Sequence, residues 1–204
     1  MNTEYGFYNG KNISLFMIKN IIKDIFRPIT NKYVLFKCKN IWNVKEYINK
    51  NKLKRGIYTS FYIDYFNKNN SYIGINTEFE NIPYFPHGIK NIFISDSAKI
   101  GKNAIIFQDV TIGSNTLNNS KRNGSPTIGD NVYIGAGAKI IGDVKIGNNV
   151  RIGANAVVVE DVPSNAVVVM NKPRVIIKKK NDNRFIKKIG NEKYYYDNNE
   201  FIKL

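Results

Sequence analysis

Hydrophobic residues recur at every sixth position from Ile94 to Pro163. The first position of each six-residue unit is Ile or Val, and the fifth is a small or β-branched residue. The first positions are Ile94, Ile100, Ile106, Ile112, Ile128, Ile134, Ile140, Ile146, Ile152 and Val158. A helix repeats about every 3.6 residues and a strand about every two, so this period fits neither element continued over such a length. The pattern predicts a short strand and a corner, repeated in stacked turns around one apolar core.

Glycine and asparagine mark the corners of this repeat. Gly stands at the second position of most units, and Asn, Asp or Gly stands at the fourth. These residue types tolerate the positive φ that tight corners require. Residues 118–127 interrupt the repeat with a sequence typical of a loop. We therefore predict a mainly β fold, a parallel β-helix, with an ordinary parallel sheet or a right-handed solenoid as the alternative.

The chain before the repeat has a different pattern. Ile13 to Phe26 predicts an amphipathic helix that ends at Pro28, and Ile41 to Leu53 predicts a second helix. Ile57 to Phe66 is aromatic and apolar, and it fits either a third helix or a strand. The segment from Ile73 to Gly88 is interpreted as an irregular first coil of the β-helix.

The net charge of +15 divides unevenly along the chain. Residues 1–91 contribute +8, residues 92–170 contribute +1 and residues 171–204 contribute +6. Nucleic-acid-binding domains usually place their basic face on the folded core, so this distribution argues against a nucleic-acid partner. We divide the chain into a mainly helical segment, 1–72, a β-helix domain, 73–170, and a basic tail, 171–204.

Composition also limits the location of the protein. Cys38 is the only cysteine, which excludes an internal disulfide framework and fits a reducing compartment. We find no secretion signal and no apolar run of the length that a membrane span needs. We therefore expect a cytoplasmic protein. The basic flanks also suit an acidic glycan or an anionic membrane surface, which leaves peripheral membrane association open.

His87 is the only histidine of the chain, and it stands in Pro86-His87-Gly88 at the entrance to the repeat. A lone histidine is usually a packed or surface residue. This one lies in an irregular segment beside a rigid scaffold, where catalytic side chains are often exposed. The hypothesis that His87 is catalytic therefore rests on its position.

The repeat and His87 together resemble the hexapeptide-repeat acyltransferases, and within them the serine acetyltransferase-like branch. The resemblance covers roughly Ile73 to Ile176. It rests on His87, on IFQDVTIGS from Ile106 to Ser114, on IGAGAKIIG from Ile134 to Gly142 and on IGANAVVVEDVP from Ile152 to Pro163. The branch that acetylates antibiotics and galactosides carries its histidine inside the repeat, and loop 118–127 contains none.

The resemblance implies a left-handed β-helix that transfers an acetyl group directly from acetyl-CoA to a hydroxyl. A neutral imidazole at His87 would take the hydroxyl proton during attack on the thioester. Backbone N–H groups, that of Gly113 among them, would hold the oxyanion that forms. Gln108 and Asp109 would contact the substrate. Such a reaction requires neither a metal ion nor a covalent enzyme intermediate.

Acetyl-CoA in this family lies between neighbouring subunits and is held mainly by backbone groups. The positions that match are Ala136, Gly137, Ala154 and Asn155, with Lys172 and Arg174 as candidates for the CoA phosphates. Corner geometry alone explains the small residues equally well, and a solvated surface explains the basic ones. The resemblance further implies a homotrimer in which loop 118–127 projects over the site of a neighbour.

Three positions depart from the serine acetyltransferase pattern. Tyr72 replaces the aspartate that partners the histidine, Pro86 replaces an aspartate that contacts the amino acid, and Gly124-Ser125 replaces an Arg-His pair. A free amino acid carries two charges that need partners, so these changes favour a neutral acceptor. Our leading hypothesis is a sugar hydroxyl in polysaccharide biosynthesis. The carboxylates left to orient His87 are those of Glu78, Glu80 and Asp109.

Other functions stay open at this point. Serine O-acetylation in cysteine biosynthesis and N-acetylation of an amino sugar both fit the same fold and base. A non-catalytic scaffold or polyanion-binding module is the alternative from another class, because fold alone does not determine function. The β-helix carbonic anhydrases bind zinc through three histidines, and the single histidine excludes that arrangement.

Overall fold

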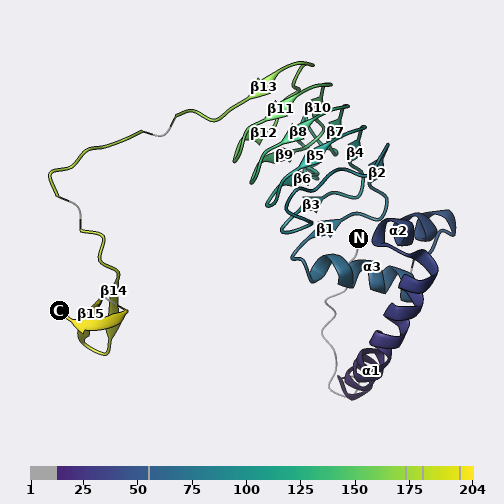
Figure 1. The fold of residues 1–204 in the computed structure, drawn as a ribbon, viewed down its shortest axis with the longest axis horizontal. Coiled ribbons are helices and arrows are strands. Elements are labelled where there is room, and N and C mark those ends of the chain that lie inside the picture. Colours follow the sequence, from purple (N-terminus) through teal and green to yellow (C-terminus); the bar gives the residue numbers. More distant parts are fainter. Residues whose placement is uncertain (1–12, 55, 173, 181, 198) are drawn as a thin grey trace. The chain divides into compact units, whose positions relative to one another are not determined.

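The computed structural model describes residues 13–204 apart from positions 55, 173, 181 and 198. The chain divides after Met170 into two compact units. The first unit contains helices and a stack of short strands, and the second contains a small antiparallel sheet (Figure 1). None of the described helices is long and apolar enough to cross a bilayer.

The repeat forms three parallel sheets, and successive strands of each sheet come from successive coils (Figure 1). Sheet 1 contains β1 (Tyr72–Ile73), β3 (Phe93–Ile94), β6 (Thr111–Gly113), β9 (Lys139–Ile141) and β12 (Val157–Val158). Sheet 2 contains β2 (Glu78–Phe79), β4 (Lys99–Ile100), β7 (Thr127–Ile128) and β10 (Lys145–Ile146). Sheet 3 contains β5 (Ile105–Ile106), β8 (Tyr133–Ile134), β11 (Arg151–Ile152) and β13 (Val167–Val168). This is the left-handed parallel β-helix, whose stacked coils the repeat predicted and whose handedness the resemblance implied.

The column of first-position residues lies inside the β-helix. Ile94, Ile106, Ile112, Ile134, Ile140 and Ile152 have no exposed surface. The register pairs Ile94 with Ile112 and Ile112 with Ile140, so like side chains stack from coil to coil. Full burial of one such side chain contributes about 1.5–3 kcal/mol. Because each strand is only two or three residues long, this column holds the stack together.

An asparagine ladder runs along the corner between sheets 2 and 3. Asn103, Asn131, Asn149 and Asn165 all adopt positive φ, between 55° and 62°. The Nδ2 group of each of the first three donates to Oδ1 of the next, at 3.0 to 3.1 Å. Asn tolerates this backbone conformation better than other non-glycine residues do. The ladder therefore both permits the corner and ties neighbouring coils together.

Three helices precede the β-helix: α1 (Ile13–Cys38), α2 (Ile41–Lys50) and α3 (Ile57–Asn67). The prediction that the first helix ends at Pro28 is wrong, because α1 continues ten residues beyond it. Val34 and Cys38 are buried in the core cluster, and this packing outweighs the backbone hydrogen bond that proline removes. The aromatic segment that fitted either a helix or a strand is the helix α3.

The helices pack on the first coil and belong to the same unit as the β-helix. Trp42 of α2 stacks on Phe85 with a ring separation of 6.0 Å and meets Phe79 edge-on at 5.8 Å. Lys45 is buried, and its Nζ donates to the carbonyl of Thr77 at 2.6 Å. Residues 73–88 form the first coil, as interpreted from the sequence, with β1 and β2 paired to the coil above.

The loop that interrupts the repeat folds back on its own coils. Asn115 and Gly124 exchange backbone hydrogen bonds of 2.8 and 2.9 Å. The guanidinium of Arg122 donates to the Asp161 carboxylate at 2.9 Å and to the Asp143 carbonyl at 3.1 Å. The backbone N–H of Lys145 and then Arg122 hold the pKa of Asp161 below its ordinary value. The loop is thus anchored at the corner between sheets 1 and 2.

The asparagine ladder makes a prediction about stability. Asn131→Ala removes two side-chain hydrogen bonds and strains a positive-φ position, so we expect a loss of about 2–3 kcal/mol in the free energy of unfolding. Asn131→Gly removes the same bonds but accepts the backbone, and it should lose clearly less. Urea unfolding followed by circular dichroism measures both. Equal losses would mean that the backbone conformation carries no part of the effect.

The burial of Lys45 predicts how the free energy of unfolding depends on pH. Its burial lowers its pKa, so the unfolded chain holds this proton to a higher pH than the folded one. The free energy of unfolding attributable to Lys45 should therefore rise as pH increases from the folded pKa toward the ordinary lysine pKa. Urea unfolding across that window should show a steeper rise for the wild type than for Lys45→Met. Parallel slopes would contradict this assignment.

Candidate active site

His87 lies in the corner of the first coil that precedes β3. Gly88 follows it with φ +71° and donates its N–H to the Phe85 carbonyl at 3.0 Å, which closes a tight turn. The His87 side chain is exposed, and its ring meets Phe107 edge-on with 5.4 Å between centroids. The turn therefore presents the imidazole to solvent while an aromatic neighbour limits its rotation.

Gln108 is the hydrogen-bond partner of His87. The distance from His87 Nδ1 to Gln108 Oε1 is 2.7 Å. Because an amide oxygen only accepts, this bond requires a hydrogen on Nδ1, so in the neutral ring the lone pair lies on Nε2. The exposed Nε2 is therefore the atom able to accept a proton. An amide thus occupies the place where many catalytic histidines have a carboxylate.

The three carboxylates proposed for orienting His87 have other partners. Glu78 lies 3.3 Å from Lys99 Nζ, and Glu80 lies 3.6 Å from Lys102 Nζ. Asp109 accepts from Asn91 Nδ2 at 2.8 Å. The side chain that orients His87 is therefore the amide of Gln108 and not a carboxylate. The resemblance had assigned Gln108 to the substrate instead. Sequence spacing could not find this bond, since it joins side chains on different coils.

Four stacked corners form an edge between sheets 3 and 1, which we call the His87 edge. It consists of residues 90–91, 108–109, 136–137 and 154–155. Backbone N–H groups connect it coil by coil: Asp109 to Lys90, Gly137 to Gln108 and Asn155 to Ala136, at 2.9 to 3.2 Å. Gln108, Asp109 and the four residues predicted for cofactor binding therefore lie in one column that continues from the corner of His87.

The C-terminal part of this edge, around residues 135–137 and 154–155, has no room for larger side chains. A Cβ at Gly137, which has φ +72°, would lie 2.1 Å from Asn155 Oδ1. A Cβ at Gly135 would lie 2.7 Å from the backbone nitrogen of Ala154. Close coil stacking is therefore one sufficient reason for these small residues. Because the side chains here are small, the backbone of the edge stays accessible to an extended ligand.

Gly113 and Ser125 lie elsewhere. Gly113 ends β6, and Ser125 accepts from or donates to Ser114 Oγ at 2.8 Å and accepts from Ser95 Oγ at 3.3 Å. This second edge, between sheets 1 and 2, is called the loop edge because loop 118–127 interrupts it. Sheet 1 separates it from the His87 edge. Among the contacts of the described residues, none joins Gly113 to His87 within the chain.

The two predicted phosphate-binding residues, Lys172 and Arg174, are exposed and belong to the second unit.

Sequence reasoning missed a group of side chains beside His87, on and next to sheet 3. Phe107 contacts Tyr133 at 5.1 Å between centroids, and the Arg151 guanidinium lies 6.0 Å from the Tyr133 ring. The available signal was partial: Tyr133 and Arg151 stand just before the first-position Ile of their units, where side chains face outward, but Phe107 follows Ile106.

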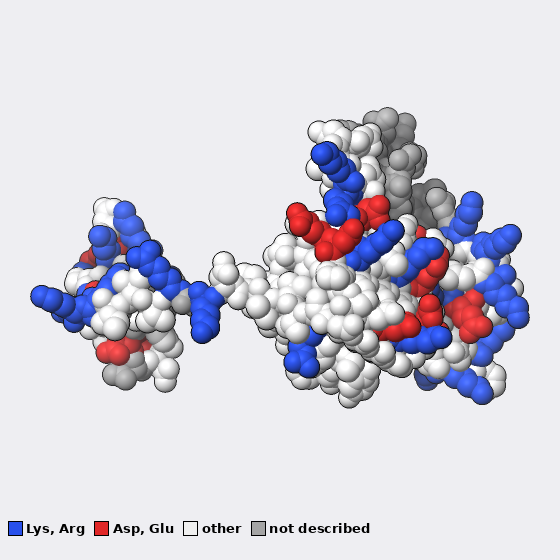
Figure 2. Space-filling view, turned by 90° about the horizontal axis from the view of Figure 1, so that it is seen from above, with Lys and Arg blue, Asp and Glu red and all other residues white. Residues whose placement is uncertain are grey.

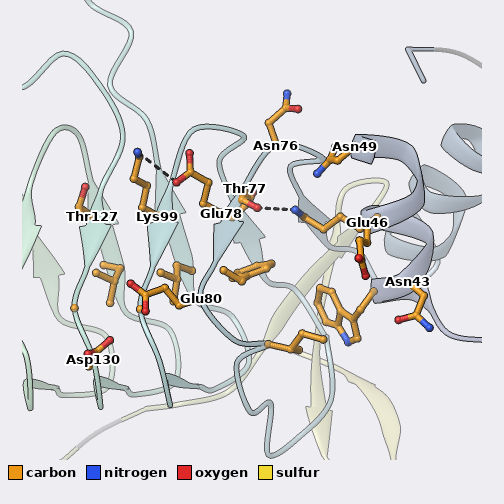
Figure 3. Close-up of a pocket in the computed structure, with 18 of the residues that line it drawn as sticks. Asn43, Glu46, Asn49, Asn76, Thr77, Glu78, Glu80, Lys99, Thr127 and Asp130 are labelled. Carbon is orange, nitrogen blue, oxygen red and sulfur yellow. Dashed lines mark hydrogen bonds and ion pairs between the residues drawn. The ribbon is translucent and has the colours of Figure 1, made fainter. Parts of the chain in front are cut away.

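A groove of about 1020 Å³ lies between α2 and sheet 2, and of the candidate functional residues singled out from the sequence only Glu78 and Glu80 line it (Figure 3). The Nζ of Lys45 donates to the Thr77 carbonyl. Glu78 faces Lys99 (Figure 3). Its charged groups are largely engaged with one another or with backbone. We therefore place the candidate site at the His87 edge, where a nitrogen base is available, rather than in this groove.

Comparison with known proteins agrees with this fold. The family model "Bacterial transferase hexapeptide (six repeats)" matches residues 125–159. Over these residues the repeat is similar to the bacterial transferase hexapeptide repeat. The resemblance to hexapeptide-repeat acyltransferases, and to their serine acetyltransferase-like branch, is confirmed. The match covers the later coils, where the period of six is most regular.

Curated relatives of this chain include serine acetyltransferases from several bacteria. A serine acetyltransferase of Staphylococcus aureus is 46% identical over 86 residues, which is 42% of this chain and 39% of that protein. The serine acetyltransferase of Mycobacterium tuberculosis is 50% identical over 78 residues, covering 38% and 33%. The chain thus matches well under half the length of these curated relatives.

Solved structures extend the likeness beyond the repeat. Serine acetyltransferase isoform 3 from Entamoeba histolytica, in complex with cysteine, aligns with TM-score 0.57 and 28% identity over 69% of this chain and 50% of that one. The soybean serine acetyltransferase apoenzyme aligns with TM-score 0.55 and 28% identity over 67% and 56%. Both cover more of this chain than the sequence matches do.

The bond between His87 and Gln108 can be tested without an enzyme assay. His87 is the only histidine, so its ring nitrogens give unambiguous NMR signals. We expect the wild type to hold the Nδ1–H form, and Gln108→Leu to relax toward the form protonated at Nε2. Gln108→Glu keeps an acceptor and should keep the Nδ1–H form. Identical ring spectra for wild type and Gln108→Leu would show that Gln108 does not orient the ring.

Proposed function

We propose that this chain is an acetyl-CoA-dependent O-acetyltransferase in which His87 is the general base. The observation that carries the proposal is the 2.7 Å bond from Nδ1 to Gln108, which leaves Nε2 exposed with a lone pair. A base must be within hydrogen-bond reach of the proton that it abstracts, and an exposed nitrogen can meet an acceptor hydroxyl. The similarity to serine acetyltransferases supports the thioester donor.

The reaction follows from this arrangement. Nε2 takes the proton of the acceptor hydroxyl as its oxygen attacks the thioester carbonyl. The resulting oxyanion needs fixed N–H donors, for which Gly113 of a neighbouring copy is our candidate. The imidazolium then gives the proton to the departing CoA sulfur. The His87 edge, with Ala136, Gly137, Ala154 and Asn155, offers a smooth track for the pantetheine arm.

L-serine is the acceptor that the comparisons favour. The relatives and solved structures named above are serine acetyltransferases, and the hexapeptide match spans two of the four corners of the His87 edge. This supports serine O-acetylation in cysteine biosynthesis over the sugar acceptor that we had favoured from the sequence. The sequence matches reach less than half of the chain, however, and a shared scaffold does not determine the acceptor.

A neutral sugar hydroxyl is the second candidate acceptor, and specific residues favour it. Pro86 offers no charge beside His87. Ser125, which stands in place of one residue of the Arg-His pair, is hydrogen-bonded to Ser95 and Ser114 and carries no charge. A zwitterionic acceptor would need partners for both of its charges in a partly desolvated site. Lys90 belongs to the His87 edge, and Lys139 of the adjoining β9 donates its Nζ to the Asp109 carbonyl.

The site needs a second copy of the chain to be complete. His87 and Gly113 lie on opposite edges of sheet 1, so a cyclic homotrimer could bring the loop edge of one protomer against the His87 edge of the next. Acetyl-CoA would lie between them, with Lys172 and Arg174 as candidates for its phosphates. We place this enzyme in the cytoplasm, where acetyl-CoA is supplied.

Release of the CoA thiol tests the proposal. We expect release from acetyl-CoA with either L-serine or a panel of neutral sugars, and a fall of about 10²–10⁴-fold in rate for His87→Ala. Lys68→Ala, an exposed change at the end of α3, is the control and should leave the rate unchanged. Serine-dependent release would assign the first acceptor. Release unaffected by His87→Ala, or no binding of acetyl-CoA by calorimetry, would overturn the mechanism.

A further inference from the structure

The second unit, residues 171–204, is a three-stranded antiparallel sheet of β14 (Ile186–Ile189), β15 (Glu192–Asp197) and β16 (Glu200–Lys203). All of its described residues are exposed or half-buried, and only Tyr194 and Tyr195 are half-buried. A sheet of three short strands without a buried face is marginal in water. The unit therefore offers a surface that gains stability when something covers it.

Apolar side chains stand out on this unit. Val175, Ile176 and Ile177 follow one another, with 84%, 61% and 94% of their surface exposed. Within the sheet, the register aligns Ile186, Tyr195 and Ile202 in one row across the three strands. Three consecutive exposed aliphatic residues, together with an apolar row in the sheet, are more than the scattered single residues of an ordinary surface.

Basic side chains accompany these apolar groups. Residues 171–204 contain ten Lys or Arg and four Asp or Glu, a net charge of +6. Lys178, Lys179 and Lys180 follow directly after the aliphatic triplet, and Lys188 pairs with Lys193 across the sheet. Figure 2 shows Lys and Arg distributed around this smaller unit. The partner of such a surface is negatively charged.

Cations also lie over aromatic rings. The guanidinium of Arg184 is 5.2 Å from the Tyr195 ring, and Nζ of Lys187 is 5.1 Å from the Phe201 ring. Phe185, Tyr196 and Phe201 form an aromatic cluster on one face, with centroids 5.3 and 6.4 Å apart. Aromatic and basic side chains placed together are characteristic of segments that lie in a membrane interface.

We propose that residues 171–204 bind the surface of an anionic lipid bilayer. The basic residues are attracted to acidic headgroups, and the aliphatic triplet enters the boundary between headgroups and acyl chains. A hydrated polyanion such as an acidic polysaccharide would use the lysines equally well. It would leave Val175, Ile176 and Ile177 in water, so the aliphatic triplet is the observation that distinguishes lipid from polyanion. Membrane binding of this kind is independent of the acceptor of the β-helix.

Flotation of the full chain with lipid vesicles tests the proposal. Vesicles of phosphatidylcholine with about one third phosphatidylglycerol should retain the protein, and vesicles of phosphatidylcholine alone should not. The triple variant K178Q/K179Q/K180Q should bind on the order of a hundredfold more weakly, since each lysine near such a surface contributes about fivefold. The control K52Q/K54Q/K68Q removes the same charge from exposed positions near α2 and α3 and should retain binding.

A second triple variant, V175S/I176S/I177S, keeps every charge and separates the two partner classes. Loss of vesicle binding, with binding to soluble dextran sulfate unchanged, is the result expected for a lipid surface. Unchanged vesicle binding by this variant, or equal weakening by the control, would overturn the proposal in favour of general polyanion attraction. Failure of the wild type to bind acidic vesicles would also overturn it. Circular dichroism of each variant checks that the fold is retained.

Insertion gives an independent measurement. In Ile177→Trp, an indole replaces the most exposed of the three aliphatic side chains. Its fluorescence should be quenched by lipids brominated on the acyl chains, relative to a matched Asn183→Trp variant outside the triplet. Equal quenching at both positions, or none at position 177, would show that the triplet does not enter the bilayer. Trp42 contributes the same background to both variants.

Discussion

The backbone at the corners is the constraint on which the rest of the molecule depends. Each coil must return the chain to the same register after every third strand, and asparagines in the left-handed region make that return possible at one edge. Once the corners are in place, the Ile side chains of successive coils stack on one another, and each short strand pairs with strands of the coils on either side. The corners are also the positions where side chains and backbone face solvent. The constraint that builds the scaffold therefore determines where ligands can approach it.

The core and the corners could be predicted from the sequence because the repeat states them directly. A period of six residues identifies Ile94 and its equivalents as inward-facing, and Gly and Asn identify the corners. The course of α1 could not be predicted, because Pro28 is a strong local signal for a helix end. Its effect is outweighed by the packing of Val34 and Cys38, which no local pattern reveals.

The candidate site, too, could be predicted from the sequence only in part. The position of His87 before the repeat was enough to single it out, and the columns through Gln108, Gly137 and Asn155 follow from coil stacking. The partner of its ring was not predictable, because Gln108 is 21 residues away and reaches His87 only through the geometry of two coils. A search for carboxylates overlooked an amide that can hold the same tautomer. The similarity to serine acetyltransferases concerns the scaffold, while the departures lie in strand β1 at Tyr72 and at the corners that hold Pro86 and Ser125.

The two ends of the β-helix are treated differently. The helices pack against the first coil, where Trp42 contacts Phe79 and Lys45 donates to the Thr77 carbonyl. At the other end β12 and β13 are the outermost strands of sheets 1 and 3. Their outward main-chain groups are a template for strand addition. Within the first unit, addition of a further strand would therefore start at this C-terminal coil rather than at the coil against which the helices pack.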